Sequence, residues 1–149
     1  MAFDLYDASI PGLIHMLGSL SSILAKGEAH GGIDPSEARL APDMLPLKAQ
    51  VYIATDSAKG CGARLAGVDI PKFEDVETSF AELRARVAKT IEFLTSLNRA
   101  DFAGAENKHI VLKFPSTTLE YSGGDYVTRF VLPNVYFHIT TAYDILRNR

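Results

Sequence analysis

Apolar residues recur every three or four positions in four stretches of the chain, which is the spacing of amphipathic helices. The first helix is predicted to begin near Asp7 or Ser9, whose side chains can cap free backbone amides. It is predicted to end at Lys26 and Gly27. The residues expected on its buried face are Ile10, Leu13, Ile14, Leu17, Ser21 and Leu24.

The second helix is predicted from about Met44 to Ala66, with Asp43 as its cap and Gly67 ending it. Small residues crowd its second half, and glycine lowers helix stability, so another helix or a second subunit is expected to approach closely there. Asp56 projects away from the core face and is expected to be solvated or paired with Lys59. The expected core face is Leu47, Val51, Ala54, Ala58, Cys61 and Leu65.

The third helix follows a capping-box pattern formed by Ser79 and Glu82 and is predicted to continue to about Leu97. Its expected core residues are Phe80, Leu83, Val87, Ile91 and Leu94, while Arg86, Lys89 and Glu92 are expected outside the core face.

The segments 109–114 and 118–121 have a different composition, rich in β-branched and aromatic residues, and predict a short β-hairpin. The last helix is predicted to start at Ser122, with Asp125 three residues on, and to be kinked by Pro133. The predicted fold class is therefore all-α. It is one domain spanning residues 1–149, an antiparallel four-helix bundle with a short β-hairpin inserted before the last helix and a long crossover from Glu28 to Pro42.

Two polar residues interrupt the apolar stripe of the last helix. Asn134 and His138 fall on the same narrow face as Val127, Val131 and Ile145, and their spacing of four lets both side chains converge on one point. Gln50, at the edge of the second helix's core face, could reach the same space. These three residues are the candidate ligand-binding residues.

The last helix also carries a second apolar stripe, which predicts burial on two sides. A homodimer interface through this helix, or a covering loop, would provide that burial. The stripe consists of Leu132, Val135, Ile139 and Leu146.

Composition narrows the class of protein further. The chain has 47% hydrophobic and 22% charged residues, a net charge of −3 and a pI near 5.8, with no basic stripe that could neutralise phosphates. Nucleic acid and membrane are therefore not expected as partners. The single Cys61 excludes an internal disulfide, and no secretory signal pattern is visible, so a cytoplasmic location is expected.

Several motifs, spread over nearly the whole chain, resemble a bacterial family of unknown function in the DinB/YfiT-like superfamily of four-helix bundles. This resemblance is carried by segments 5–11, 38–44, 58–60, 64–67, 71–73 and 132–138, together with Gln50.

The resemblance implies a divalent-metal site made by three histidines, one on the second helix and two on the last, and in some members a metal-dependent thiol transferase or isomerase. The matching positions here are Gln50, Asn134 and His138, of which only His138 is a histidine. Because zinc and nickel prefer imidazole or thiolate over amide oxygen, a divalent metal at His138 is disfavoured.

Two hypotheses follow. The first is a homodimeric small-molecule-binding or structural protein with a degenerate metal site. The second is a metal-dependent enzyme that retains a site centred on His138. A buried histidine that only fixes helix register through Asn134, Gln50 or a tyrosine is the structural alternative for His138. The sequence leaves open the ligand, the catalytic residues and whether the protein is an enzyme.

Overall fold

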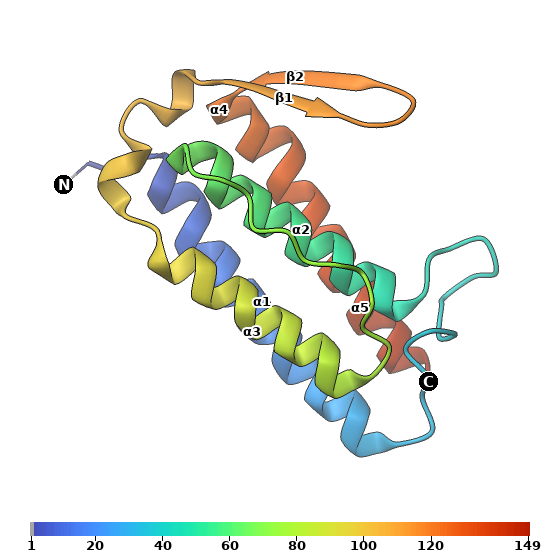
Figure 1. Cartoon of the computed structure of the whole chain (residues 1–149). Helices are drawn as coiled ribbons and strands as arrows, with labels where there is room; N and C mark the ends of the chain where they lie inside the picture. Colours follow the sequence, from blue (N-terminus) through green and yellow to red (C-terminus); the bar gives the residue numbers. More distant parts are fainter. Residues whose placement is uncertain (1) are drawn as a thin grey trace.

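The computed structural model describes residues 2–149, and within this range four long helices form a bundle in which α2 and α3 run in one direction and α1 and α5 in the other (Figure 1). A β-hairpin and a few short helical turns precede the last long helix. The elements in chain order are α1 (Leu5–His30), α2 (Leu47–Ala66), α3 (Phe80–Ser96), η1 (Arg99–Phe102), η2 (Ala105–Asn107), β1 (His109–Lys113), β2 (Thr118–Ser122), α4 (Gly123–Asp125), η3 (Tyr126–Val131) and α5 (Leu132–Asn148). The predicted fold class is confirmed.

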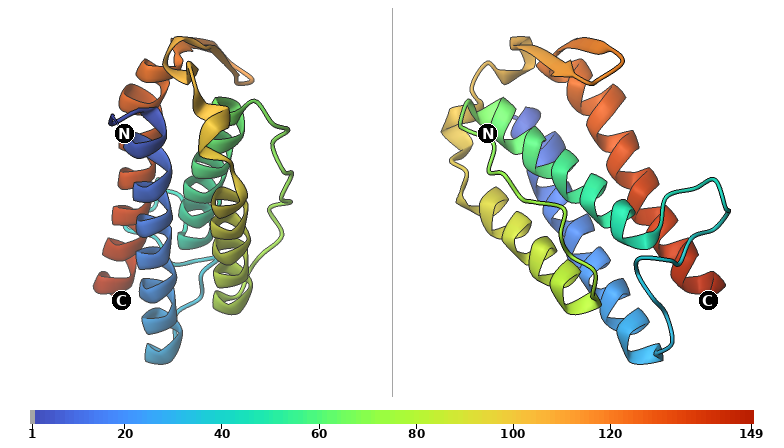
Figure 2. Two further views of the ribbon diagram at one scale, coloured as in Figure 1. Left: turned by 90° about the vertical axis from the view of Figure 1, so that its left-hand side faces the viewer. Right: turned by 45° about the vertical axis from the view of Figure 1, so that its right-hand side comes forward.

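Helix α1 packs mainly on α3, and α2 mainly on α5. The left view of Figure 2 also shows α1 beside α5 and α2 beside α3. Their apolar faces meet in one core, whose burial stabilises the fold through the hydrophobic effect. The core stripe predicted for α2 is fully buried along its whole length, from Leu47 to Leu65. In α1 the predicted Ile10, Leu13, Leu17 and Leu24 are fully buried, as is Leu20. The predicted Ile14 and Ser21 are only partly buried.

Helix α1 begins earlier than predicted because Asp4, not Asp7 or Ser9, caps it. The Asp4 carboxylate accepts a hydrogen bond from the Asp7 amide, and the Asp7 carboxylate accepts one from the Asp4 amide. This reciprocal capping box satisfies amides that the first helical turn leaves free. The bidentate ion pair between Asp7 and Arg99 lowers the pKa of the Asp7 carboxyl further.

The prediction that α1 ends at Gly27 is wrong, because Gly27 serves packing inside the helix. A Cβ at this position would lie 2.8 Å from Leu146 and 3.0 Å from Phe80, so only glycine allows these side chains so close. The helix ends instead at Gly31, whose φ of 81° lies in the left-handed region.

By length and composition alone, α1 is the one helix among the described residues that could cross a membrane. Core packing against the other helices accounts for part of the apolar character of this helix. The fully buried residues are Ile10, Leu13, Leu17, Leu20 and Leu24, whereas Ile14, Met16 and Ile23 are only partly buried.

Helix α2 starts at Leu47, after the predicted Met44, because Pro46 occupies the N-cap position. Its end is as predicted, since Gly67 adopts the left-handed conformation of a helix C-cap. The Ser79 cap of α3 is also confirmed, with its hydroxyl accepting a hydrogen bond from the Glu82 amide.

The predicted hairpin is present as two antiparallel strands, paired from His109 with Ser122 to Lys113 with Thr118. The hairpin lies across the end of the bundle where α2 finishes, beside α4, which follows it in the chain (Figure 1). Lys108 fixes this position by donating a hydrogen bond from Nζ to the Leu65 carbonyl at 2.5 Å.

The predicted fourth helix is continuous but contains a π-helical turn, η3, directly before α5. Pro133 lies in the first turn of α5. Its ring lacks an N–H and would clash with the carbonyl four residues earlier, so the preceding turn widens. The irregularity that Pro133 predicts is therefore present as a π turn.

Candidate functional site

The three candidate residues lie on facing surfaces of α2 and α5 and are joined in two separate hydrogen bonds. His138 Nδ1 lies 2.6 Å from Gln50 Oε1. The Asn134 side chain donates from Nδ2 to Ser57 Oγ at 2.7 Å. The structure thus brings His138 to Gln50 but gives Asn134 a different partner, Ser57.

Asn134 and His138 are half-buried at the edge of the α2–α5 contact, and the expectation that they occupy the inner stripe is only partly met. The core face of α5 is the stripe that was expected to need an outside partner. The π turn rotates α5 relative to the residues before it, which moves the apolar stripe inward. Of that stripe, Val135 and Ile139 are buried, and Leu132 and Leu146 are partly buried. Ala142 and Ile145 complete the buried face, although Ile145 was expected on the face of Asn134 and His138.

The hydrogen bonds of Gln50 determine which nitrogen of His138 carries a proton. Gln50 Nε2 donates to the Leu45 carbonyl at 3.1 Å, which leaves Oε1 as an acceptor facing the imidazole. The neutral histidine must therefore be protonated at Nδ1, with its lone pair on Nε2. Burial lowers the pKa of His138, so the neutral form is favoured at neutral pH.

This donor set does not fit a zinc- or nickel-type metal. His138 offers one nitrogen, Nε2, and the other two positions offer amide oxygens, which are poor ligands for these metals. Between residues 2 and 149, no three His, Cys, Asp or Glu side chains gather closely enough to hold a metal ion. The residues present are better suited to hydrogen bonding than to coordination.

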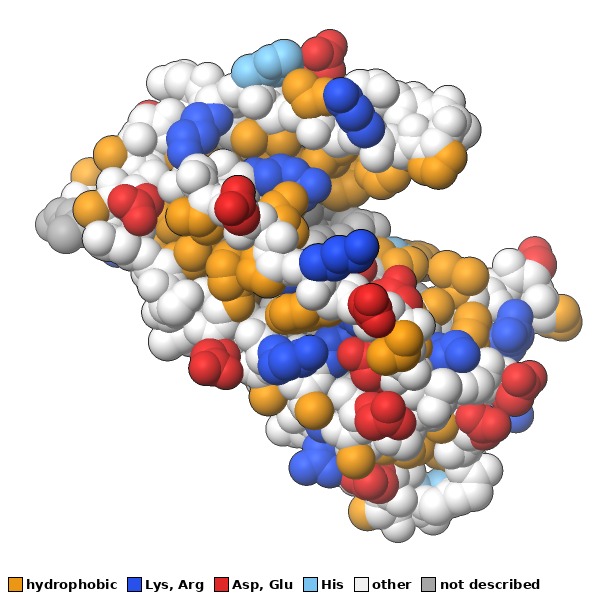
Figure 3. All heavy atoms as spheres, in the orientation of Figure 1, with side chains coloured by type: hydrophobic (Ala, Val, Ile, Leu, Met, Phe, Trp, Pro, Cys, Tyr) orange, Lys and Arg blue, Asp and Glu red, His pale blue; other side chains and the backbone are white. Residues whose placement is uncertain are grey.

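Beside Asn134 and Ser57 a hollow opens between α2, η3 and the hairpin, and the space-filling view shows the surface notched below the hairpin (Figure 3). This hairpin pocket has a volume of about 240 Å³. Apolar side chains form much of its wall. The lining residues are Ile53, Asp56, Ser57, Arg64, Leu112, Phe114, Tyr126, Phe130 and Asn134.

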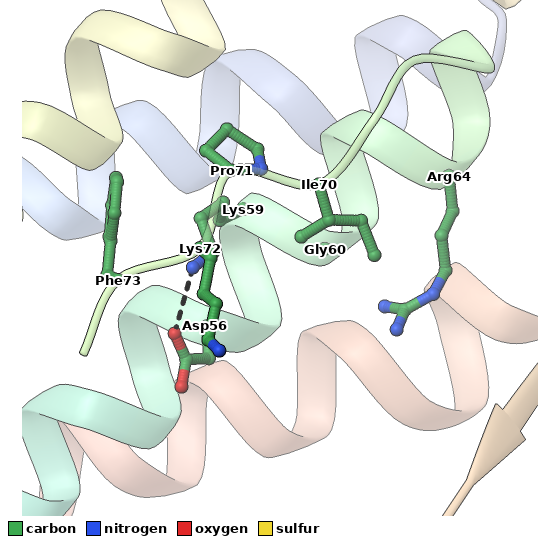
Figure 4. Close-up of a pocket in the computed structure, with 8 residues that line it drawn as sticks. All are labelled: Asp56, Lys59, Gly60, Arg64, Ile70, Pro71, Lys72 and Phe73. Carbon is green, nitrogen blue, oxygen red and sulfur yellow. Dashed lines mark ion pairs between the residues drawn. The ribbon is translucent and has the colours of Figure 1, made fainter. Parts of the chain in front are cut away.

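A second hollow of about 440 Å³ lies between α2 and the segment that connects it to α3 (Figure 4). We call this segment, residues 67–79, the strap, and the hollow the strap pocket. The two pockets share Asp56 and Arg64 and therefore adjoin along the outer side of α2, and we call the two together the cleft. The strap pocket is lined by Asp56, Lys59, Gly60, Arg64, Ile70, Pro71, Lys72 and Phe73.

Arg86 holds the strap in place, and the expectation that it lies outside the core face is wrong. Its side chain is completely buried, because the strap covers this side of α3. The guanidinium pairs with Asp56 at 2.8 Å, Asp75 at 3.0 Å and Glu77 at 3.2 Å, and Nε donates to Thr55 Oγ1. One arginine of α3 therefore ties α2 to the strap.

Asp56 pairs with Lys59 at 3.2 Å, as the sequence allowed, and with Arg86 as well. The Lys59 ammonium also lies 4.0 Å from the centre of the Phe73 ring. Burial lowers the pKa of Lys59, while the Asp56 carboxylate opposes that shift.

Arg64 and Tyr126 line the cleft from α2 and η3, and sequence reasoning did not single out either of them. Arg64 Nη1 donates to the Tyr126 hydroxyl at 2.9 Å. Burial raises the pKa of Tyr126 to about 12, so this hydroxyl stays neutral. The crowding of small residues in α2 was the signal for this region, since it predicted a close approach there.

The fold, with its hairpin before the last helix and its polar pairs between α2 and α5, defines a DinB-like bundle. The crystal structure of a DinB family member protein from Shewanella denitrificans matches it with a TM-score of 0.84 and 39% sequence identity, covering 97% of this chain and 85% of that chain. The family model for a domain of unknown function, DUF1993, matches residues 5–149, and the chain belongs to that family. No curated protein matches the chain.

Proposed function

We propose that this DinB-like protein binds a small molecule in the cleft along α2, with Asn134 and Ser57 at its polar edge and the Gln50–His138 pair one turn farther along α5. The observation that carries the proposal is the hairpin pocket, where polar groups from α2 and α5 meet an apolar wall. Ligand pockets commonly combine an apolar lining with a few placed polar groups.

The proposal is tested by a fragment screen followed by amide chemical shifts in the intact chain. Fragments should perturb Ile53, Phe130 and Asn134, and Ser57→Phe should abolish these effects by filling the pocket. Ser22→Phe, on the exposed face of α1, is the matched control and should bind as the wild type does. Perturbations confined to other surfaces, or unchanged in Ser57→Phe, would rule the cleft out as the binding site.

The alternative of a metal-dependent thiol transferase or isomerase centred on His138 is not supported by the donor set. Metal analysis of untagged protein addresses it directly. Stoichiometric zinc or nickel that disappears in His138→Ala would restore this alternative.

We further infer a homodimer that forms through the outer side of α5, and a cytoplasmic location, which suits a chain whose one cysteine is free and buried. Tyr136 and Tyr143 lie two turns apart on one side of α5 and are 44% and 45% exposed, with Phe137 beside them at 55%. Exposed aromatic clusters are typical of protein interfaces.

Light scattering at micromolar concentration tests this interface. The wild type should have the mass of a dimer, and Phe137→Glu should be monomeric. Val76→Glu, on the exposed strap, should remain dimeric. A monomeric wild type would disprove the dimer.

A further inference from the structure

The guanidinium of Arg64 lies inside the cleft because Gly60, one turn earlier in α2, has no side chain. A Cβ at Gly60 would collide with Nη1 of Arg64. The close-up shows the Arg64 side chain extended beside Gly60 and Ile70 rather than away from the pocket (Figure 4). Gly60 weakens the helix relative to alanine, and the space it leaves admits this cation.

Most of the hydrogen-bonding capacity of Arg64 is still available. A guanidinium has five N–H donors. Its one side-chain hydrogen bond within residues 2–149 is the one to Tyr126, so the remaining donors can serve a ligand. Arg64 lines both the strap pocket and the hairpin pocket, so a group bound to it would lie where the two meet.

The side chains that line the strap pocket carry a net positive charge. Its lining contains the cations Lys59, Arg64 and Lys72 and a single carboxylate, Asp56. Asp56 is already shared by Lys59 and the buried Arg86. Among the described residues, neither Arg64 nor Lys72 forms an ion pair.

The other half of the cleft is aromatic. The rings of Phe114 and Phe130 lie 6.2 Å apart, and those of Phe130 and Tyr126 are stacked at 6.1 Å. Phe114 is 44% exposed at the end of the hairpin although it lines the pocket. An apolar group placed there would cover aromatic surface that water now contacts.

From these two halves we propose that the cleft binds an amphipathic anion, with a carboxylate or phosphate at Arg64 and Lys72 and an aromatic or similarly bulky apolar body beneath the hairpin. This inference rests on the proposed function and adds the chemical class of the ligand. Arg64 binds the head group through charge-assisted hydrogen bonds, which are stronger than neutral ones. Lys72 adds a point charge, and Phe114 and Phe130 contact the apolar body.

The test uses three probes of one body and different charge: 1-naphthoate, 1-naphthyl phosphate and 1-naphthylmethylamine. Calorimetry gives the affinities and amide chemical shifts locate the probe on the intact chain. At least one acid should bind about tenfold or more tightly than the amine, as expected for a charge-assisted contact. Whichever acid binds more tightly identifies the head group, and added salt should weaken that binding.

Two pairs of variants assign the effect to Arg64. Arg64→Gln should weaken acid binding by about tenfold or more without weakening amine binding, whereas Arg84→Gln, a surface arginine paired with Glu28, should change neither. Gly60→Ala should also weaken acid binding, because it displaces the guanidinium. Its matched control is Gly18→Ala, where a Cβ has nothing within 4 Å.

Equal affinity of acids and amine in the cleft, unaffected by Arg64→Gln, would overturn the anion assignment and leave the proposed binding function standing. Acid binding that maps outside the cleft would also overturn it. Absence of any probe or screened fragment from the cleft would reject both. A thermal unfolding curve for each variant separates loss of binding from loss of fold.

Discussion

His138 Nδ1 on α5 lies 2.6 Å from Gln50 Oε1 on α2, although 88 residues separate them in the sequence. The contact closes the polar edge of the interface between two helices that otherwise meet through apolar side chains. It also holds the histidine in a partly buried site, where the charged imidazolium is disfavoured.

This burial makes stability depend on pH. Burial lowers the pKa of His138 below its ordinary value of 6.5, so as the pH falls below 6.5 the unfolded chain takes up a proton that the folded chain resists. The free energy of unfolding should therefore decrease with falling pH in this window. Urea unfolding of wild type and His138→Gln measures it, and the difference between the two chains cancels the groups they share. Identical pH slopes would show that His138 does not contribute.

Replacing Arg86 with methionine should destabilise the fold by about 3 kcal/mol, because Glu77 loses its partner while nearly buried. The measurement is the free energy of unfolding in urea. Arg84→Met is the control, since the half-exposed Arg84–Glu28 pair should contribute less than about 1 kcal/mol. Equal losses in both variants would contradict the role assigned to Arg86. The strap should also become more susceptible to limited proteolysis in Arg86→Met.

Replacement by alanine should change the stability of the fold very differently at the two adjacent glycines that follow the hairpin. A Cβ at Gly123 would collide with the Ala105 carbonyl, whereas one at Gly124 meets only the Glu106 carbonyl oxygen at 3.8 Å. Gly123→Ala should cost about 2 kcal/mol or more, since backbone must move. Gly124→Ala should be neutral or slightly stabilising. Melting temperatures decide the matter, and a Gly123→Ala protein as stable as wild type would refute the close approach.

Cys61 should not react with thiol reagents in the folded protein. It is completely buried, and desolvation raises the pKa of its thiol to about 12, so thiolate is scarce at neutral pH. Labelling with a chromogenic disulfide should be slow in buffer and fast in denaturant. Rapid labelling of the folded chain would indicate that α2 opens locally.

Periodicity predicted the helices well because each has a regular apolar face, as the fully buried stripe from Leu47 to Leu65 shows. It failed for Arg86, because the strap that buries this residue has no periodic pattern from which its position could be predicted. It also failed for Gly27, whose role depends on Leu146 and Phe80 from distant parts of the chain.

The candidate site was predicted only in part, because helical spacing determines which residues share a face but not which partners they meet. The four-residue spacing correctly placed Asn134 and His138 on one side of α5, and Gln50 reaches His138 as expected. The partner of Asn134 could not be predicted, because the π turn in η3 changes the rotation of α5 relative to α2. Arg64 was missed because its position depends on the absence of a side chain at Gly60.

The π turn in η3 has a consequence for how this cleft could be altered. A π turn contains one residue more than the α-helical turn it replaces, so deletion of a single residue within 126–131 could restore a regular helix. The wider turn absorbs the extra residue, so the segments on either side of such a deletion would keep the faces they present now. A deletion in the regular part of α5 has no extra residue to remove, so it would turn the preceding residues by about 100° and move Tyr126 away from Arg64. The shape of the cleft thus depends on where along this helix a residue is lost as well as on its side chains.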